Sequence, residues 1–143
     1  MTTSSELTAL VARLSSTGAE GATEFDLAGD PPGVESLGRE IAALVGDLDV
    51  NAVLGWWTPE ETVFAHVIAA ALGVQRSGAE RDLGLLTVAP ALPAGARVLV
   101  VATAFNPEYP LAPLETMLAG GGHVLVAALS LDPVAGVRVD RRA

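Results

Sequence analysis

The sequence predicts a three-layer α/β/α domain whose sheet is mainly parallel. Segments with helical periodicity alternate with apolar runs along the chain, which is the order expected of an α/β fold. The strongest run, RVLVVATA at residues 97–104, shows no alternation of polar and apolar residues, so both of its faces should be buried. Ligands of such a sheet bind at the carboxyl ends of its strands. A small-molecule site should therefore involve the loops at 55–59 and 102–110.

Two helices are predicted in the N-terminal part. Residues 3–6 (TSSE) match a helix-capping box, and apolar residues follow at spacings of three and four. Residues 17–32 are predicted to form a loop that includes a short edge strand. The second helix should start after two prolines, end at Gly46, and carry Glu35 and Arg39 as an outward ion pair one turn apart.

The rest of the chain supplies the sheet. Thr58, Pro59 and Glu61 have the arrangement typical of a helix start, and Gly73 is a suitable stop. The predicted elements are, in order, a buried strand at 50–54, a helix at 59–72, a weak strand at 85–88, the strand at 97–104, a helix at 111–119 and a last strand at 123–131.

A single domain is predicted for the 143 residues, with an N-terminal helix and loop at 1–32, a core at 33–133 and a basic tail at 134–143. The net charge is −9, and all eight basic residues are arginines, so nucleic acid is not expected as a partner and lysine chemistry is excluded. No apolar stretch is long enough for a membrane span, and the chain has neither a signal-peptide pattern nor cysteine. A cytoplasmic location without membrane contact is therefore expected.

Trp56 and Trp57 are adjacent at the end of a predicted strand, and two interpretations of them stay open. They can form a stacking platform for a base or an anchor at a protein interface. Alternatively, one indole closes the core and the other lies on the surface.

Thr103 and Asn106 can hydrogen-bond a ligand at the end of the strand at 97–104, but ordinary turn chemistry is the favoured interpretation.

Glu60 and Glu61 look like a catalytic carboxylate pair. Neighbours on a helix point about 100° apart, however, and both residues fit helix capping, so capping is favoured. His66 and His123 have neither a nucleophile pattern nor a metal-ligand spacing. No catalytic residue and no metal site are expected.

The stretch GARVLVV at 95–101 and the glycine-led strand at 120–131 carry a family resemblance. Together with the order of elements over 34–133, they resemble the core of a type I phosphoribosyltransferase, with orotate phosphoribosyltransferase-like proteins the most similar in layout. The resemblance implies a phosphoribosyltransferase-like fold, a link to nucleotide metabolism and a tendency to dimerise. In an active member it also implies phosphoribosyl diphosphate as substrate, with Mg²⁺.

The phosphate-binding loop departs from that family. Where the family has an acidic pair, this chain has Ala102 and Thr103, and where the family has Thr-Thr-Gly, it has residues 106–108 (NPE). Proline supplies no N–H, and a glutamate repels phosphate. Without lysine, Arg76 and Arg81 are the basic residues that lie about where the family contacts phosphate.

We therefore predict a catalytically degenerate phosphoribosyltransferase-like protein that serves as a scaffold or regulatory subunit, as a homodimer or with a related subunit. A mean hydropathy of +0.46 favours such an interface. No cofactor is expected, and Mg²⁺ is expected to bind only if the protein retains phosphoribosyl transfer activity. Two alternatives stay open: a module that binds a nucleotide, a nucleobase or a phosphorylated sugar, and an active transferase with a diverged phosphate loop. The candidate ligand-binding residues are Gly55, Trp56, Trp57, Thr58, Arg76, Arg81, Thr103, Asn106 and Tyr109.

Overall fold

The computed structural model describes residues 5–18 and 21–142, so the first half of the predicted capping box lies outside it. The helices are α1 (Ser5–Leu14), α2 (Pro31–Val45), α3 (Pro59–Leu72) and α4 (Ala112–Gly120), with a 3-10 helix at Gly46–Leu48. The strands are β1 (Ser15–Thr17), β2 (Thr23–Phe25), β3 (Ala52–Trp56), β4 (Gln75–Asp82), β5 (Leu85–Ala89), β6 (Arg97–Ala102), β7 (Val124–Asp132) and β8 (Gly136–Arg141). None of the helices in this part of the chain has the length and apolar character that crossing a membrane requires.

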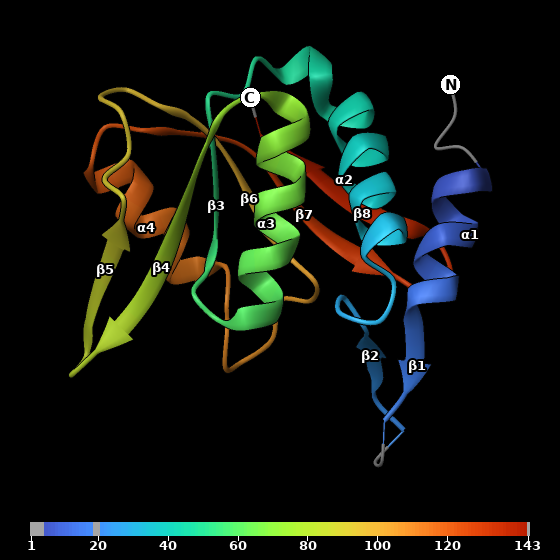
Figure 1. Ribbon diagram of the computed structural model, residues 1–143. Coiled ribbons are helices and arrows are strands. Elements are labelled where there is room, and N and C mark those ends of the chain that lie inside the picture. Colours follow the sequence, from blue (N-terminus) through green and yellow to red (C-terminus); the bar gives the residue numbers. More distant parts are fainter. Residues whose placement is uncertain (1–4, 19–20, 143) are drawn as a thin grey trace.

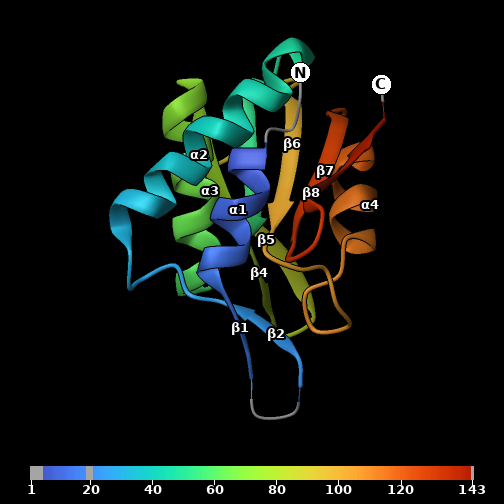
Figure 2. The same cartoon turned by 90° about the vertical axis from the view of Figure 1, so that its right-hand side faces the viewer.

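Six of the strands form one sheet in the order β5-β4-β3-β6-β7-β8. The four central strands are parallel, and the edge strands β5 and β8 pair antiparallel with their neighbours. Helices α1, α2 and α3 lie on one face and α4 on the other (Figures 1 and 2). The predicted three-layer, mainly parallel fold is therefore confirmed.

Each face of the sheet has its own hydrophobic core. Val53 and Leu99 pack beneath α1, α2 and α3, whereas Leu54 and Val100 pack with Leu114 of α4. Neighbouring residues of one strand thus enter opposite cores, because side chains alternate along a strand. This explains why the central strands are apolar without interruption.

The predicted start of α3 is confirmed, whereas α2 starts at Pro31 and includes the two prolines that were expected to precede it. Asp30 and Thr58 cap the two helices, each accepting a hydrogen bond from the backbone N–H three residues later. The two helices touch at Gly38, where a Cβ would lie only 2.5 Å from the carbonyl oxygen of Val67. Glycine is therefore what permits this close approach.

Two strands of the six-stranded sheet, β4 and β8, are absent from the prediction, and so is β1 of the small hairpin. The β4 sequence is QRSGAERD, which has no apolar run, and it becomes a strand through its parallel pairing with β3. The supposed basic tail instead forms β8, which pairs antiparallel with β7. Two of its arginines form ion pairs within the chain, Arg138 with Asp132 and Arg141 with Asp47. The supposed loop at 17–32 also contributes to a hairpin of β1 and β2.

Candidate functional site

The candidate site lies where the chain connections diverge, between the carboxyl ends of β3 and β6. From β3 the chain passes through α3 to β4 on one side, and from β6 it passes through α4 to β7 on the other side. The two loops that leave this point turn away from each other, which in open α/β sheets creates a ligand crevice. The loops that the sequence singled out, after Gly55 and after Ala102, are these two.

A buried carboxylate bridges the two loops. Glu61, in the first turn of α3, accepts a 2.8 Å hydrogen bond from the backbone N–H of Thr103 and a 2.5 Å bond from the Thr103 hydroxyl. Glu61 is only 9% exposed. Its own N–H donates to the Thr58 hydroxyl, so one side chain joins the cap of α3 to the end of β6.

Burial raises the pKa of the Glu61 carboxyl above its ordinary value, since the charged form loses water. The two hydrogen bonds from Thr103 lower this pKa, and the nearby charge of Glu60 raises it further. The favoured capping role of the Glu61 side chain is therefore wrong, because the Thr58 N–H donates to the Trp56 carbonyl oxygen and the Glu61 carboxylate accepts from Thr103. The residue does stand in the first turn of the helix, but its carboxylate is used across the crevice.

The loop after β6 is folded around Asn106. The amide oxygen of Asn106 accepts hydrogen bonds from the N–H groups of Glu108 and Tyr109, at 2.9 and 2.8 Å. The Tyr109 N–H also lies 3.1 Å from the Asn106 carbonyl oxygen. Pro107 and Pro110 have no N–H to offer. The favoured turn interpretation of Asn106 is confirmed, and these N–H groups point at the chain itself.

An aromatic cluster borders the crevice. Trp56 is 3% exposed and donates a 3.2 Å hydrogen bond from Nε1 to the Pro110 carbonyl oxygen. Its ring lies 5.8 Å from that of Tyr109, and the Arg81 guanidinium lies 5.2 Å from the indole centre. Trp57 is 49% exposed, and its ring lies over Gly78, where a Cβ would overlap it. One indole therefore closes the core, and the other lies at the surface.

These side chains surround an open pocket of about 320 Å³ between the end of β3, the strand β4 and the loop after β6. The aromatic rings and Arg81 supply flat apolar surface and one positive charge, while Glu80 and Glu108 supply negative charge. Such a mixture suits a planar ligand by stacking. The lining residues are Trp56, Trp57, Thr58, Ala79, Glu80, Arg81, Glu108 and Tyr109.

Five of the nine predicted ligand residues line this pocket: Trp56, Trp57, Thr58, Arg81 and Tyr109. Four do not. Gly55 is buried under α3, where an added Cβ would lie 3.3 Å from the Val101 carbonyl oxygen and 3.4 Å from the Ala65 Cβ. Thr103 is bonded to Glu61, and Asn106 holds its own turn.

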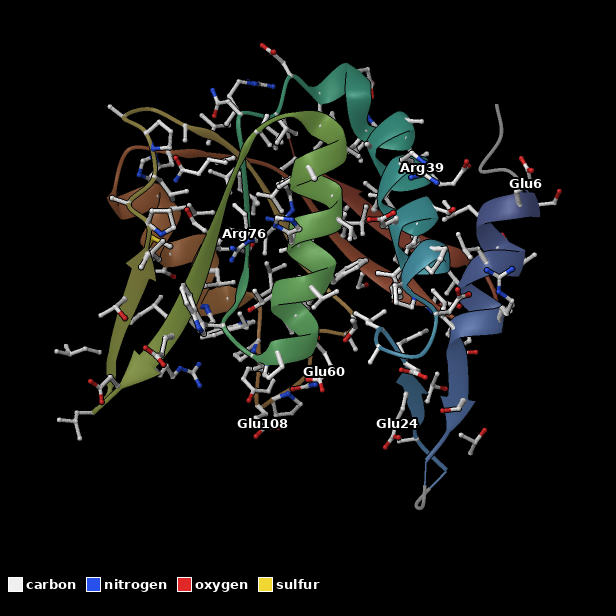
Figure 3. The ribbon with its side chains drawn as sticks, in the orientation of Figure 1. Glu6, Glu24, Arg39, Glu60, Arg76 and Glu108 are labelled. Carbon is white, nitrogen blue, oxygen red and sulfur yellow. The ribbon has the colours of Figure 1, made fainter. Side chains whose placement is uncertain are left out.

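Arg76 lies beside α3, away from Glu60 and Glu108 at the carboxyl end of the sheet (Figure 3). Arg76 and Arg81 are five residues apart on β4, so their side chains leave opposite faces of the sheet. The structure therefore does not bring the two arginines together.

Neither histidine belongs to the crevice. His123 accepts the Ala96 N–H at Nδ1, 3.1 Å away, and His66 lines a groove between α2 and α3. Within residues 5–18 and 21–142, no group of three or more His, Cys, Asp or Glu side chains is placed to hold a metal ion. The residue that the sequence does not reveal is Glu61, because its partner lies 42 positions away.

The comparisons with known proteins agree with this geometry. No protein-family model and no curated protein matches the chain, but solved structures do. Adenine phosphoribosyltransferase from Trypanosoma brucei, in complex with AMP, pyrophosphate and ribose-5-phosphate, superposes with a TM-score of 0.66 at 11% identity, over 90% of this chain and 68% of that one. Orotate phosphoribosyltransferase from Mycobacterium tuberculosis H37Rv, in complex with inorganic phosphate, gives 0.60 at 24% identity, over 86% and 71%. A phosphoribosyltransferase from Corynebacterium diphtheriae gives 0.60 at 22% identity, over 90% and 81%. The chain therefore has the fold of the type I phosphoribosyltransferases.

Proposed function

We propose that this chain is a phosphoribosyltransferase-like protein that does not transfer phosphoribosyl groups and acts as a scaffold or regulatory subunit of an oligomer. The contact between Glu61 and Thr103 carries the proposal. A phosphate site needs converging N–H groups and positive potential. Here the N–H and the hydroxyl of Thr103 are both taken by a carboxylate of the same chain.

The rest of the loop supports the same conclusion. The N–H groups of Glu108 and Tyr109 are held by Asn106, and two prolines reduce the number of donors further. Glu108 adds negative charge, and the chain has no lysine. Binding a phosphate dianion here would require breaking these contacts against charge repulsion.

Titration calorimetry with phosphoribosyl diphosphate, with and without Mg²⁺, tests the proposal. We expect no binding tighter than about 100 μM, which corresponds to about 5–6 kcal/mol. An assay of pyrophosphate release with adenine, orotate and other bases should show no turnover, with an active adenine phosphoribosyltransferase as positive control. Mg²⁺-dependent binding together with pyrophosphate release would overturn the proposal and favour an active transferase with a diverged loop.

The pocket favours a second candidate function, the binding of a nucleobase or nucleotide without turnover. The half-exposed Trp57 ring and the Arg81 guanidinium on Trp56 are the specific observation behind it. Tryptophan fluorescence titrated with AMP or orotate measures this binding. Trp57→Ala should weaken it at least tenfold, while Val134→Ala, an exposed apolar residue in another loop, should leave it unchanged. Absence of saturable binding in the unmodified protein would remove this candidate.

A further inference from the structure

The outer side of α3 is apolar, although it faces solvent. Val63 is 40% exposed. Between residues 63 and 71, the other fully or partly exposed residues of this helix are His66, Val67, Ala70 and Ala71, and of these only His66 is polar. A surface helix of a globular protein ordinarily carries polar residues on this side. An apolar outer face on a helix is therefore a sign of a covered surface.

A groove runs between this side of α3 and α2. It has a volume of about 310 Å³ and is lined by Glu35 and Arg39 of α2 and by His66, Val67, Ala70 and Ala71 of α3. Together with Val63, these residues define what we call the α2–α3 face. Figure 1 shows the two helices side by side on the outside of the molecule, with their N-termini at the same end.

Neither Glu35 nor Arg39 of the α2–α3 face forms an ion pair with another described residue. Glu35 and Arg39 stand one helical turn apart, at the spacing of an ion pair, but the expected pair does not form. Arg39 donates instead to the Ser36 hydroxyl at 3.0 Å. In the described part of the chain, the Glu35 carboxylate makes no ion pair and accepts no hydrogen bond.

This arrangement is complementary to itself. A two-fold axis that lies in the face, perpendicular to α2 and passing between Glu35 and Arg39, turns one copy antiparallel to the other. Glu35 then faces Arg39 of the second copy, and Arg39 faces Glu35 of the second copy. Isologous contacts of this kind are the commonest in homo-oligomers.

The same axis also matches side-chain sizes. Gly38 touches α3 at Val67, so the axis crosses α3 near that residue. Antiparallel packing about Val67 places the larger Val63 of one copy against the small Ala71 of the other. Packed helix axes lie 8–10 Å apart, depending on the side chains at the contact.

We propose that the α2–α3 face is a dimerisation surface for a second copy of this chain, arranged with antiparallel helices. This inference rests on the oligomeric part of the proposed function and specifies where the oligomer forms. Two reciprocal ion pairs at its edge select the antiparallel register, and the apolar side of α3 supplies the buried area.

Charge exchange tests the proposal. Sedimentation velocity and light scattering should give about twice the 14.5 kDa chain mass for the unmodified protein at micromolar concentration. Glu35→Arg and Arg39→Glu should each weaken dimerisation at least tenfold, because each places two pairs of like charges together. Glu24→Arg, on the β1–β2 hairpin away from α2 (Figure 3), is the matched control and should dimerise normally.

Mixing the two weakened variants is the decisive arm. A heterodimer of Glu35→Arg with Arg39→Glu restores opposite charges at both positions, so native mass spectrometry of differently tagged chains should show the mixed dimer in excess of either homodimer. Restoration also proves that both variants are folded. A monomeric unmodified protein, or a dimer that neither variant weakens, overturns the proposal. The oligomeric state of these proteins does not test the binding of phosphoribosyl diphosphate, which the calorimetry above measures separately.

Discussion

Replacing Glu61 by alanine and by glutamine, compared as a pair, tests whether this carboxylate holds the crevice loops together. It accepts two hydrogen bonds from Thr103, at 2.8 and 2.5 Å. Alanine leaves the N–H of Thr103 without an acceptor, which should lower the free energy of unfolding by about 1–3 kcal/mol. Glutamine keeps an oxygen for that N–H and can donate its amide to the hydroxyl, so its cost should stay below about 1 kcal/mol.

The pH dependence of the same variants is a second readout. Because burial raises the pKa of Glu61 in the folded state, the native protein holds this proton more tightly than the unfolded chain does. This contribution to stability is complete below the ordinary pKa of 4.5 and is lost as the pH rises through the raised value. Glu61→Gln cannot titrate, so its stability relative to the unmodified protein should increase with pH over this window.

Urea unfolding followed by circular dichroism at several pH values from 4.5 upward measures both effects. The order expected is alanine least stable at every pH, with the glutamine variant gaining on the unmodified protein as the pH rises. Equal unfolding free energies for all three proteins at every pH would refute the reasoning, since the carboxylate would then be neither desolvated nor bonded to Thr103.

Two further predictions concern the fold. Gly38→Ala should lower the unfolding free energy by about 1–3 kcal/mol, because the added Cβ would lie 2.5 Å from the Val67 carbonyl oxygen. The control is Gly46→Ala, which has open space around it and should be neutral or slightly stabilising. Urea titration compares the two variants. The pKa of Asp132 is lowered to about 2 by the N–H groups that follow it and by Arg138, so its stabilising effect should be complete above 3.8 and lost as the pH falls through about 2. Asp132→Asn should flatten this acid limb in thermal unfolding, and an unchanged limb would contradict the assignment.

The elements that could be predicted are those whose own residues carry the pattern. The helices α2 and α3 have side-chain N-caps and periodicity, α4 has Leu114 and Leu118 at helical spacing, and β6 is apolar on both faces. The strand β4 has neither, because its buried residues Ser77, Gly78 and Ala79 are small and its outer residues are charged. Its conformation comes from pairing with β3, which a local pattern does not encode.

The site shows the same division. Its position at the carboxyl ends of β3 and β6 follows from the order of elements alone. The sequence leaves open whether Trp56 and Trp57 differ in burial. In the structure, Trp56 lies in the core and Trp57 lies at the surface. The bridge from Glu61 to Thr103 could not be predicted, because capping already accounts for a glutamate in the first turn of a helix.

Helix α3 connects the two proposed activities. Its first turn contains Glu61, which closes the crevice, and its middle contains Val67, which lines the α2–α3 face. A ligand held by Trp57 and Arg81 touches neither of these, since neither Glu61 nor Val67 lines the pocket. Ligand binding and dimerisation should therefore be independent as long as Glu61 stays bonded to Thr103. Coupling between them would require α3 itself to move, and the contact of Gly38 with Val67 then transmits that movement to α2.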